Sequence, residues 1–296
     1  MLLRLAPLLF VLLWSTGFIA SKVGAHHAEP FSFLAVRFAF VLAILLPWAL
    51  MRKTVWPSRQ VMVQAALTGL LIHTAYLGGV LSALREGMAT GLIAIVVSTQ
   101  PILTAVLAGP LLGEWPGRRH WAGLFLGLIG VILVLGPKLV DVATEEAIST
   151  LALVSVAASL LGITLGTLNQ KAHGMSGDLV ALTIAQYAAA FVSAFMLAAF
   201  TETMNIDWTL EFALALAWLV IVLSIGAIGL LMLMIRAREV SRVTSLFYLV
   251  PPTTALMAAG MFGETLGAVQ VVGILLVMAA VFVIRPTAQA VPVKPV

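Results

Sequence analysis

The chain has 296 residues, of which 62% are hydrophobic and only 9% are charged, and its mean hydropathy is +1.13. A soluble domain has about a quarter charged residues, so this chain could not cover a water-facing surface with polar groups, and lipid must surround most of its exterior. The absence of cysteine excludes disulfides, thiolate metal sites and cysteine nucleophiles. The formal net charge of +4 does not indicate nucleic-acid binding, because Lys and Arg stand in small groups beside apolar runs.

Ten apolar runs follow one another along the chain, and a helix needs about 20 such residues to cross a bilayer. The first run, 5–21, follows Arg4 as in a signal peptide, but nine similar runs come after it, so we interpret it as a helix of the mature chain. The second begins at Pro30, a residue that suits the first position of a helix, and only Arg37 interrupts it before residue 51. The other eight runs cover residues 60–84, 87–113, 120–137, 147–170, 179–201, 212–235, 243–263 and 265–284. The sequence therefore predicts an all-α integral membrane protein with ten transmembrane helices.

The distribution of basic residues predicts the orientation, because Lys and Arg favour the cytoplasmic side of a membrane. If the N-terminus is cytoplasmic, 12 of the 16 basic residues fall on cytoplasmic segments, and most acidic residues fall on the opposite side. We therefore expect both termini to lie in the cytoplasm.

The second half of the chain repeats the first. A shift of 150 residues superposes eight identical pairs: Pro101 on Pro251, Thr104 on Thr254, Ala105 on Ala255, Ala108 on Ala258, Gly113 on Gly263, Glu114 on Glu264, Gly117 on Gly267 and Gly123 on Gly273. With a shift of 149, Lys22 meets Lys171 and Glu29 meets Asp178. We predict two five-helix halves, residues 1–140 and 147–286, and a short cytoplasmic tail over residues 287–296. Because each half has an odd number of spans, the halves are inverted relative to each other, which is typical of secondary transporters.

The sequence also resembles a known family. Residues 14–18 (Trp-Ser-Thr-Gly-Phe), Arg37 with Phe38, and the repeated Pro followed by Gly-Glu and a Gly-rich helix resemble the drug/metabolite transporter superfamily, in particular its EamA-type branch of ten-helix carriers. The resemblance covers about residues 5–285. It implies an alternating-access carrier whose cavity is formed mainly by helices one to four and six to nine. The second-half counterpart of Arg37 is Gln186, so any basic role there exists in one half only.

Two polar residues within the predicted spans are the leading candidates for function. Arg37 lies about 10 Å into its helix and must face protein or water. It would attract a substrate carboxylate, or it would pair with Glu29 or Glu86 and hold helices together. His73, close to Tyr76 in the middle of the third span, would contact a substrate and respond to pH, or would bridge two helices.

Further polar or aromatic residues near helix centres are candidates to line the same cavity: Trp14, Ser15, Thr16, Ser98, Gln100, Thr164, Gln186, Tyr187 and Tyr248. Beside Pro101 and Pro251, such side chains would also repair hydrogen bonds that proline removes. We interpret Glu114 and Glu264 as structural. The small face made by Gly123, Gly127 and Gly130 predicts close packing within the chain or a homodimer.

Several classes of function lack their motifs. The sequence has no Gly-rich phosphate loop of an ATP-driven pump, no His-x-x-x-His motif with a nearby carboxylate and no paired-carboxylate cluster of an enzyme, so we expect neither cofactor nor metal. The sequence also lacks the ring of charges that a channel would need. No Asp or Glu lies deep in a predicted span, so coupling through buried carboxylates is not supported. We expect a transporter that binds a small molecule and membrane lipid but no nucleic acid. The resemblance implies export of metabolites such as amino acids, aromatic or hydrophobic ones included, across a bacterial inner membrane; drug or xenobiotic efflux is the alternative.

Overall fold

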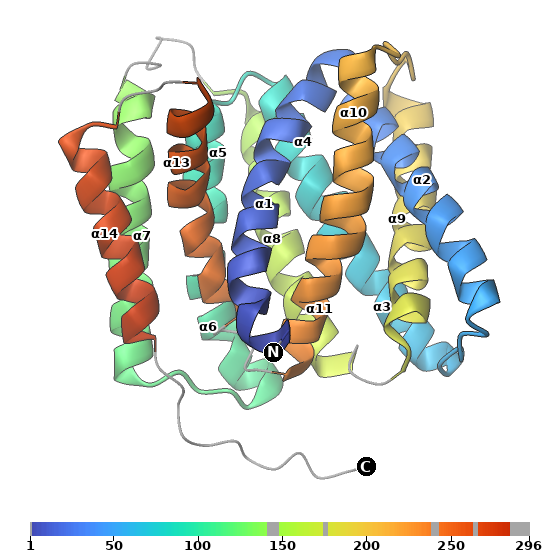
Figure 1. The fold of residues 1–296 in the computed structure, drawn as a ribbon, viewed down its shortest axis with the longest axis horizontal. Coiled ribbons are helices and arrows are strands. Elements are labelled where there is room, and N and C mark those ends of the chain that lie inside the picture. The colour runs from blue at the N-terminus through green and yellow to red at the C-terminus, as the bar shows by residue number, and fades with distance from the viewer. Residues whose placement is uncertain (1, 141–147, 174–176, 238–242, 263–265, 285–296) are drawn as a thin grey trace.

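A computed structural model of the chain describes residues 2–140, 148–173, 177–237, 243–262 and 266–284, and nearly all of them are helical (Figure 1). The helices of the first half are α1 (Leu2–His27), α2 (Pro30–Met51), α3 (Arg59–Gly69), the π-helical η1 (Leu70–Leu77), α4 (Gly78–Arg85), α5 (Thr90–Val97), α6 (Gln100–Leu112) and α7 (Arg118–Val140). Those of the second half are α8 (Thr150–His173), α9 (Leu179–Thr201), α10 (Leu210–Trp218), the π-helical η2 (Leu219–Ala227), α11 (Ile228–Ala237), the 3₁₀ turn η3 (Ser245–Leu249), α13 (Val250–Phe262) and α14 (Ala268–Val283).

Seven helical segments are long and apolar enough to cross a membrane: Pro30–Met51, Arg59–Arg85, Gly91–Leu112, Arg118–Gly136, Thr150–His173, Leu179–Thr201 and Leu210–Arg236. Shorter apolar helices cover Leu5–Gly17 and Ala268–Val283. The protein is therefore all-helical and built to cross a membrane several times. The count of ten spans stays a prediction. Figure 1 shows that α1 begins, and α14 ends, at the same end of the bundle; the opposite end, where α1 ends and α2 begins, is called the mouth end below.

Two helices change their geometry just before a proline. The first half has a turn at Ser98 and Thr99 between α5 and α6, and the Thr99 hydroxyl donates to the Val96 carbonyl at 2.7 Å. In the second half, η3 gives way to α13 one residue before Pro251. Proline has no N–H and its ring clashes with the preceding turn, so the helix must yield there.

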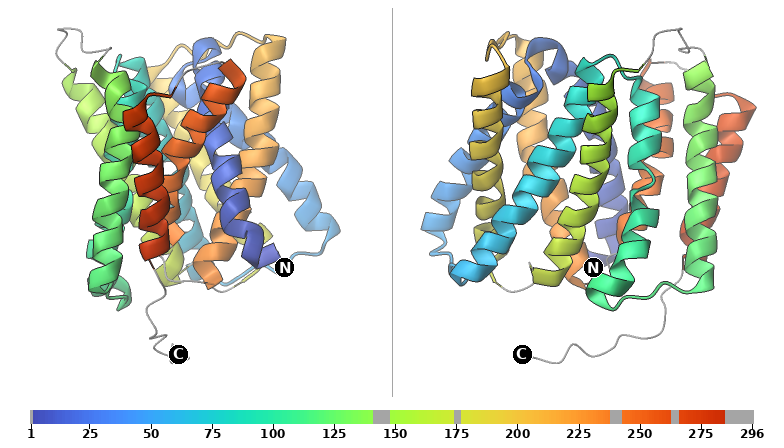
Figure 2. Two further views of the ribbon diagram at one scale, coloured as in Figure 1. Left: turned by 60° about the vertical axis from the view of Figure 1, so that its left-hand side comes forward. Right: turned by 180° about the vertical axis from the view of Figure 1, so that it is seen from behind.

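Helices α7 and α14 pack together at one edge of the bundle (Figures 1 and 2). Their backbones approach closely at Gly130 and Gly273, where a Cβ added to either glycine would lie less than 3.0 Å from the carbonyl oxygen of the other. Gly123 similarly faces Ile284, and Gly127 accommodates the ring of Tyr248. The glycine face that the sequence predicts is therefore used for packing inside the chain. Glu264 lies outside the described residues, whereas Glu114 lies 3.8 Å from Lys171 at the end of α8.

The centre of the bundle brings the two halves together. Helix α1 packs against α10, η2, α11 and α13, whereas α8 packs against α3, η1, α4 and α6, and α2 packs along α9 (Figure 2). Glycines permit the closest approaches, since a Cβ on Gly69 would lie 2.1 Å from the Gln186 carbonyl oxygen. Each half therefore supplies helices that contact mainly the other half.

Candidate functional site

A cavity of about 1370 Å³ lies between the helices and opens at the mouth end. Its described lining comes from α1, α2, η1, α4, α5, η2, α11 and α13, with a small part of α7. Helices α8 and α9 contribute no described lining residue, although Thr203 and Asn205, just after α9, stand at the rim. The volume exceeds the ~300–1,000 Å³ of typical small-molecule clefts, so a metabolite and surrounding water both fit.

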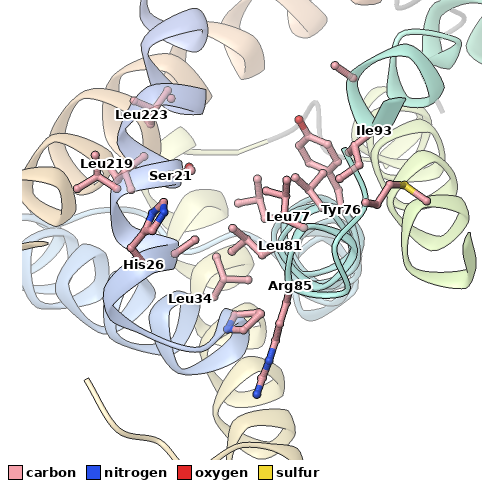
Figure 3. Close-up of a pocket in the computed structure, with 18 of the residues that line it drawn as sticks. Ser21, His26, Leu34, Tyr76, Leu77, Leu81, Arg85, Ile93, Leu219 and Leu223 are labelled. Carbon is pink, nitrogen blue, oxygen red and sulfur yellow. The ribbon is translucent and has the colours of Figure 1, made fainter. Parts of the chain in front are cut away.

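The walls of the cavity are mainly apolar. Leu34 on α2 and Leu77 and Leu81 on the η1–α4 helix face Leu219 and Leu223 on η2 across the opening (Figure 3). These side chains come from both halves of the chain. The cavity therefore offers an apolar surface to part of a ligand, with polar groups confined to its floor and rim.

Arg37 is the charged residue deepest in the cavity. Arg37 is only 5% exposed, and its Nε–H donates to the Ser224 hydroxyl of η2 at 3.0 Å. The Ser224 carbonyl in turn accepts a hydrogen bond from the Tyr187 hydroxyl at 3.1 Å. No described carboxylate lies within 4.0 Å of the guanidinium. Glu29 pairs with Arg85 instead, and Glu86 accepts from Ser149. Arg37 is thus held in place by neutral groups.

His73 forms part of the floor beside Arg37. Its ring stacks on Tyr187, with the centroids 4.2 Å apart and the planes at 15°, and Phe38 packs against both rings at 5.9 Å and 5.5 Å. The Nε2 atom of His73 is buried and has no hydrogen-bond partner among the described residues. Tyr187 lies behind His73 and does not line the cavity. The imidazole is therefore fixed by ring packing between α2 and α9.

A second aromatic cluster closes the cavity on the side of α1. Trp14 lines the cavity, while Phe10 and Phe247 lie beyond it, and the three ring centroids are 5.1 to 5.3 Å apart. All three residues are at least 92% buried. This cluster joins α1 to η3 and blocks passage toward the end of the bundle where α1 begins.

The rim holds two carboxylates that bind each other's helix ends. Glu202, at the end of α9, accepts from Phe31 N at 2.8 Å and from Ser32 N and Ser32 Oγ at 2.7 Å, so it caps the start of α2. Glu29, just before α2, accepts from Thr203 N at 2.6 Å and Oγ1 at 2.8 Å. Arg85 lies 2.6 Å from Glu29 and 3.9 Å from Glu202. Desolvation would raise the pKa of Glu29, but the hydrogen bonds from Thr203 and the charge of Arg85 together outweigh it and lower that pKa below its ordinary 4.5.

Comparison with known proteins identifies the architecture. Residues 3–136 match the model of the EamA-like transporter family. Over its first half, the chain is thus similar to transporters of this family. It is 27% identical over 297 residues to the uncharacterized inner membrane transporter YedA of Escherichia coli strain K12, covering 100% of this chain and 95% of that protein. It is 26% identical over 287 residues to a probable amino-acid metabolite efflux pump of Salmonella typhimurium strain LT2, covering 93% and 92% of the two chains.

A solved crystal structure shares the fold of this chain. The two superpose with a TM-score of 0.75 over 95% of this chain and 96% of that one, at 17% sequence identity. Among the described residues, no group of three or more His, Asp or Glu could hold a metal ion.

The structure places four of the twelve candidate residues on the cavity: Trp14, Arg37, His73 and Tyr76. The other eight are not among its described lining residues. Several of these bond within their own helix: Ser15 donates to Val11 O at 2.7 Å, Thr164 to Leu160 O at 2.7 Å and Gln100 to Thr104 at 3.3 Å. Others join neighbouring helices or pack against them: Thr16 accepts from Trp218 at 2.9 Å, Gln186 faces Met232, Tyr187 donates to Ser224 O, and Tyr248 packs on Gly127. Ser98 is buried in the turn between α5 and α6.

The apolar lining and most of the rim residues do not stand out in the sequence. Leu77 with Leu81, and Leu219 with Leu223, are spaced four apart and so share a helix face. In a membrane helix, however, such a face is equally suited to lipid. The exposed Arg85 and the half-buried Ser21 and His27 also line the cavity near its opening.

Proposed function

We propose that this transporter exports small organic metabolites, amino acids with apolar side chains in particular, through the cavity by alternating access. The observation that carries the proposal is a cavity with apolar walls and a buried cation on its floor, open at one end and closed at the other. An amphipathic metabolite needs both kinds of surface. The relative named as a probable amino-acid metabolite efflux pump supports the substrate class and the direction.

Two inverted five-helix halves, ten transmembrane helices in all, are part of the proposal. The π-helical segments support it, because η1 begins at Leu70 and η2 at Leu219, which are 149 residues apart, as the sequence repeat requires. The packing supports it as well: the partners of α1 (α10, η2, α11 and α13) correspond by the same shift to the partners of α8 (α3, η1, α4 and α6). Residues 1–140 and 147–286 are the proposed halves, with a tail over 287–296.

The transporter lies in the inner membrane with both termini in the cytoplasm, so the mouth end faces the outside in this conformation. The YedA relative is named an inner membrane transporter, which supports the location. Alternating access then requires the cluster of Phe10, Trp14 and Phe247 to separate. It also requires Lys171, which lies 3.8 Å from Glu114 and donates to the Ile235 carbonyl at 3.1 Å, to release these partners at the cytoplasmic end.

The buried charge distinguishes this proposal from drug efflux. Apolar walls suit both kinds of cargo, but an exporter of cationic drugs would need a buried carboxylate. On the described floor of the cavity, the buried charged side chain is instead the guanidinium of Arg37. This arrangement favours a metabolite that carries negative charge.

Purified protein in liposomes loaded with labelled amino acids tests the function, with and without an imposed proton gradient. We expect saturable flux that does not depend on the gradient, because no carboxylate for coupling lies on the described floor. Accumulation driven by the gradient would overturn the uncoupled mechanism, and absence of flux for every amino acid would overturn the substrate class. Since the chain has no cysteine, Leu81→Cys tests the orientation: a membrane-impermeant maleimide added to intact cells should label it. Labelling only after lysis contradicts an outward-facing mouth.

A further inference from the structure

The strongest unassigned feature of the cavity is the free part of the Arg37 guanidinium. A guanidinium has five N–H donors. Only the Nε–H is used, by Ser224, and Nη1 and Nη2 have no hydrogen-bond or ion-pair partner among the described residues. These two atoms are not sealed in protein, and Arg37 lines the cavity. A buried cation costs several kcal/mol unless it is paired, so this floor is prepared for an anion.

The geometry of the free donors suits one kind of anion. With Nε tied to Ser224 at 3.0 Å, the planar guanidinium cannot rotate freely, and its two terminal nitrogens remain as a pair. Such a pair binds both oxygens of one carboxylate. The ring stack of His73 on Tyr187 supports this position from below, since the Tyr187 hydroxyl bonds to the carbonyl of the same Ser224.

The described lining of the cavity offers no carboxylate for an ammonium group next to that carboxylate. The acidic residue among its described lining is Glu29, which lies eight positions before Arg37, about 12 Å further out at 1.5 Å per residue. Glu29 is also engaged by Arg85 and by the backbone of Thr203 and Met204. In an α-amino acid the two charged groups are separated by one carbon, so a carboxylate bound to Arg37 leaves the ammonium too far away to reach Glu29.

We infer that the site recognises its substrates by their carboxylate, through Nη1 and Nη2 of Arg37, and that the α-amino group does not contribute to binding. This deepens the proposed function, on which it rests, by naming the substrate class: carboxylates with an apolar tail, of which apolar amino acids are one case. Removal of the amino group therefore leaves binding intact. Removal or amidation of the carboxylate weakens it by about tenfold or more, as expected for the loss of hydrogen bonds between two charged groups.

Ligand-induced thermal stabilisation of the purified full-length protein tests this, because a ligand raises the unfolding midpoint according to its affinity. The four probes are leucine, 4-methylpentanoate, leucinamide and 3-methylbutylamine. We expect similar affinities for the first two and at least about tenfold weaker binding of the last two. Equal stabilisation by the amide or the amine, no stabilisation by any probe, or binding of leucine but not of 4-methylpentanoate would overturn the inference.

Variants assign the effect to Arg37. Arg37→Gln should bind carboxylate and amide equally, whereas Arg37→Lys should keep a weaker preference for the carboxylate. Arg52→Gln is the matched control, because Arg52 is half exposed at the opposite end of α2. A preference for carboxylates that persists in Arg37→Gln contradicts the inference. If Arg37→Gln does not fold, the four probes on the wild-type protein decide. Carboxylate-selective binding without amino-acid flux defeats only the proposed function, and flux without carboxylate selectivity defeats only this inference.

Discussion

Replacement of Gly69 by alanine should separate two helices that now touch. Gly69 is the last residue of α3, and an added Cβ would lie 2.1 Å from the Gln186 carbonyl oxygen and 2.5 Å from the Gln186 Cα of α9. Contacts below 3.0 Å essentially do not occur for a Cβ atom, so the backbones must move apart by about 1 Å. Both atoms belong to backbone, which means that no side-chain rotation relieves the clash.

Overpacking of this kind costs about 1–3 kcal/mol. For a chain of this size we expect the unfolding midpoint to fall by about 2–4 °C for each kcal/mol. The displacement also reaches the floor of the cavity, because His73 follows Gly69 by about one turn and Tyr187 is the neighbour of Gln186. The stack of these two rings at 4.2 Å should therefore loosen, and transport should fall more than stability alone would explain.

The assay is thermal unfolding of purified protein in detergent, together with flux in liposomes. Gly136→Ala in α7 and Gly229→Ala in α11 are matched controls, because nothing lies within 4 Å of a Cβ at either position. Each should leave the free energy of unfolding unchanged or raise it by up to about 1 kcal/mol, through the higher helix propensity of alanine. If Gly69→Ala unfolds at the wild-type temperature and transports normally, the close approach of α3 and α9 is not as the structure has it.

Three further outcomes are expected from unfolding midpoints. Glu202→Gln should cost about 1.5–3 kcal/mol, because its carboxylate caps α2, whereas the exposed Glu211→Gln should change little; equal effects would refute the cap. Because the pKa of Glu29 is lowered on folding, its contribution to the stability of the fold is complete above pH 4.5 and is lost as the pH falls through the pKa of the folded state. The unfolding midpoints of wild type and Glu29→Gln should therefore converge at acidic pH. A difference between the midpoints that does not narrow would speak against this contribution. Thr16→Val should cost about 1 kcal/mol through loss of the bond from Trp218, and an unchanged midpoint would contradict that bond.

The helical segments could be predicted from the sequence because lipid imposes one simple demand on them. A run of about 20 apolar residues can satisfy its backbone in a bilayer only as a helix. The π-helical segments could not be predicted, because no composition marks the place where hydrogen bonds shift by one residue. They contribute His73 (η1) to the floor of the cavity and Ser224 (η2) as the hydrogen-bond acceptor of Arg37, which agrees with the tendency of π-helical segments to occur at functional sites.

The cavity could be predicted only in part. Arg37 and His73 stand out because a polar side chain within a membrane helix is costly unless it faces protein or water. Ser15 and Thr164 stand out for the same reason, but their hydroxyls donate to carbonyls one turn earlier in their own helices. Local bonds of this kind leave no trace in the sequence. The leucine walls carry no signal either, since lipid and cavity select the same residue type.

The two carboxylates at the rim join the ends of α2 and α9. Glu29, just before α2, binds the backbone after α9, and Glu202, just after α9, binds the start of α2. Separation of these two helices would therefore leave both carboxylates without these hydrogen-bond donors. At the other ends of the two helices, Asp178 just before α9 lies 3.9 Å from Arg52 just after α2. The interface between α2 and α9 is thus held together at both ends. The alternating access proposed above would instead separate α1 from η3, which meet through the rings of Phe10 and Phe247.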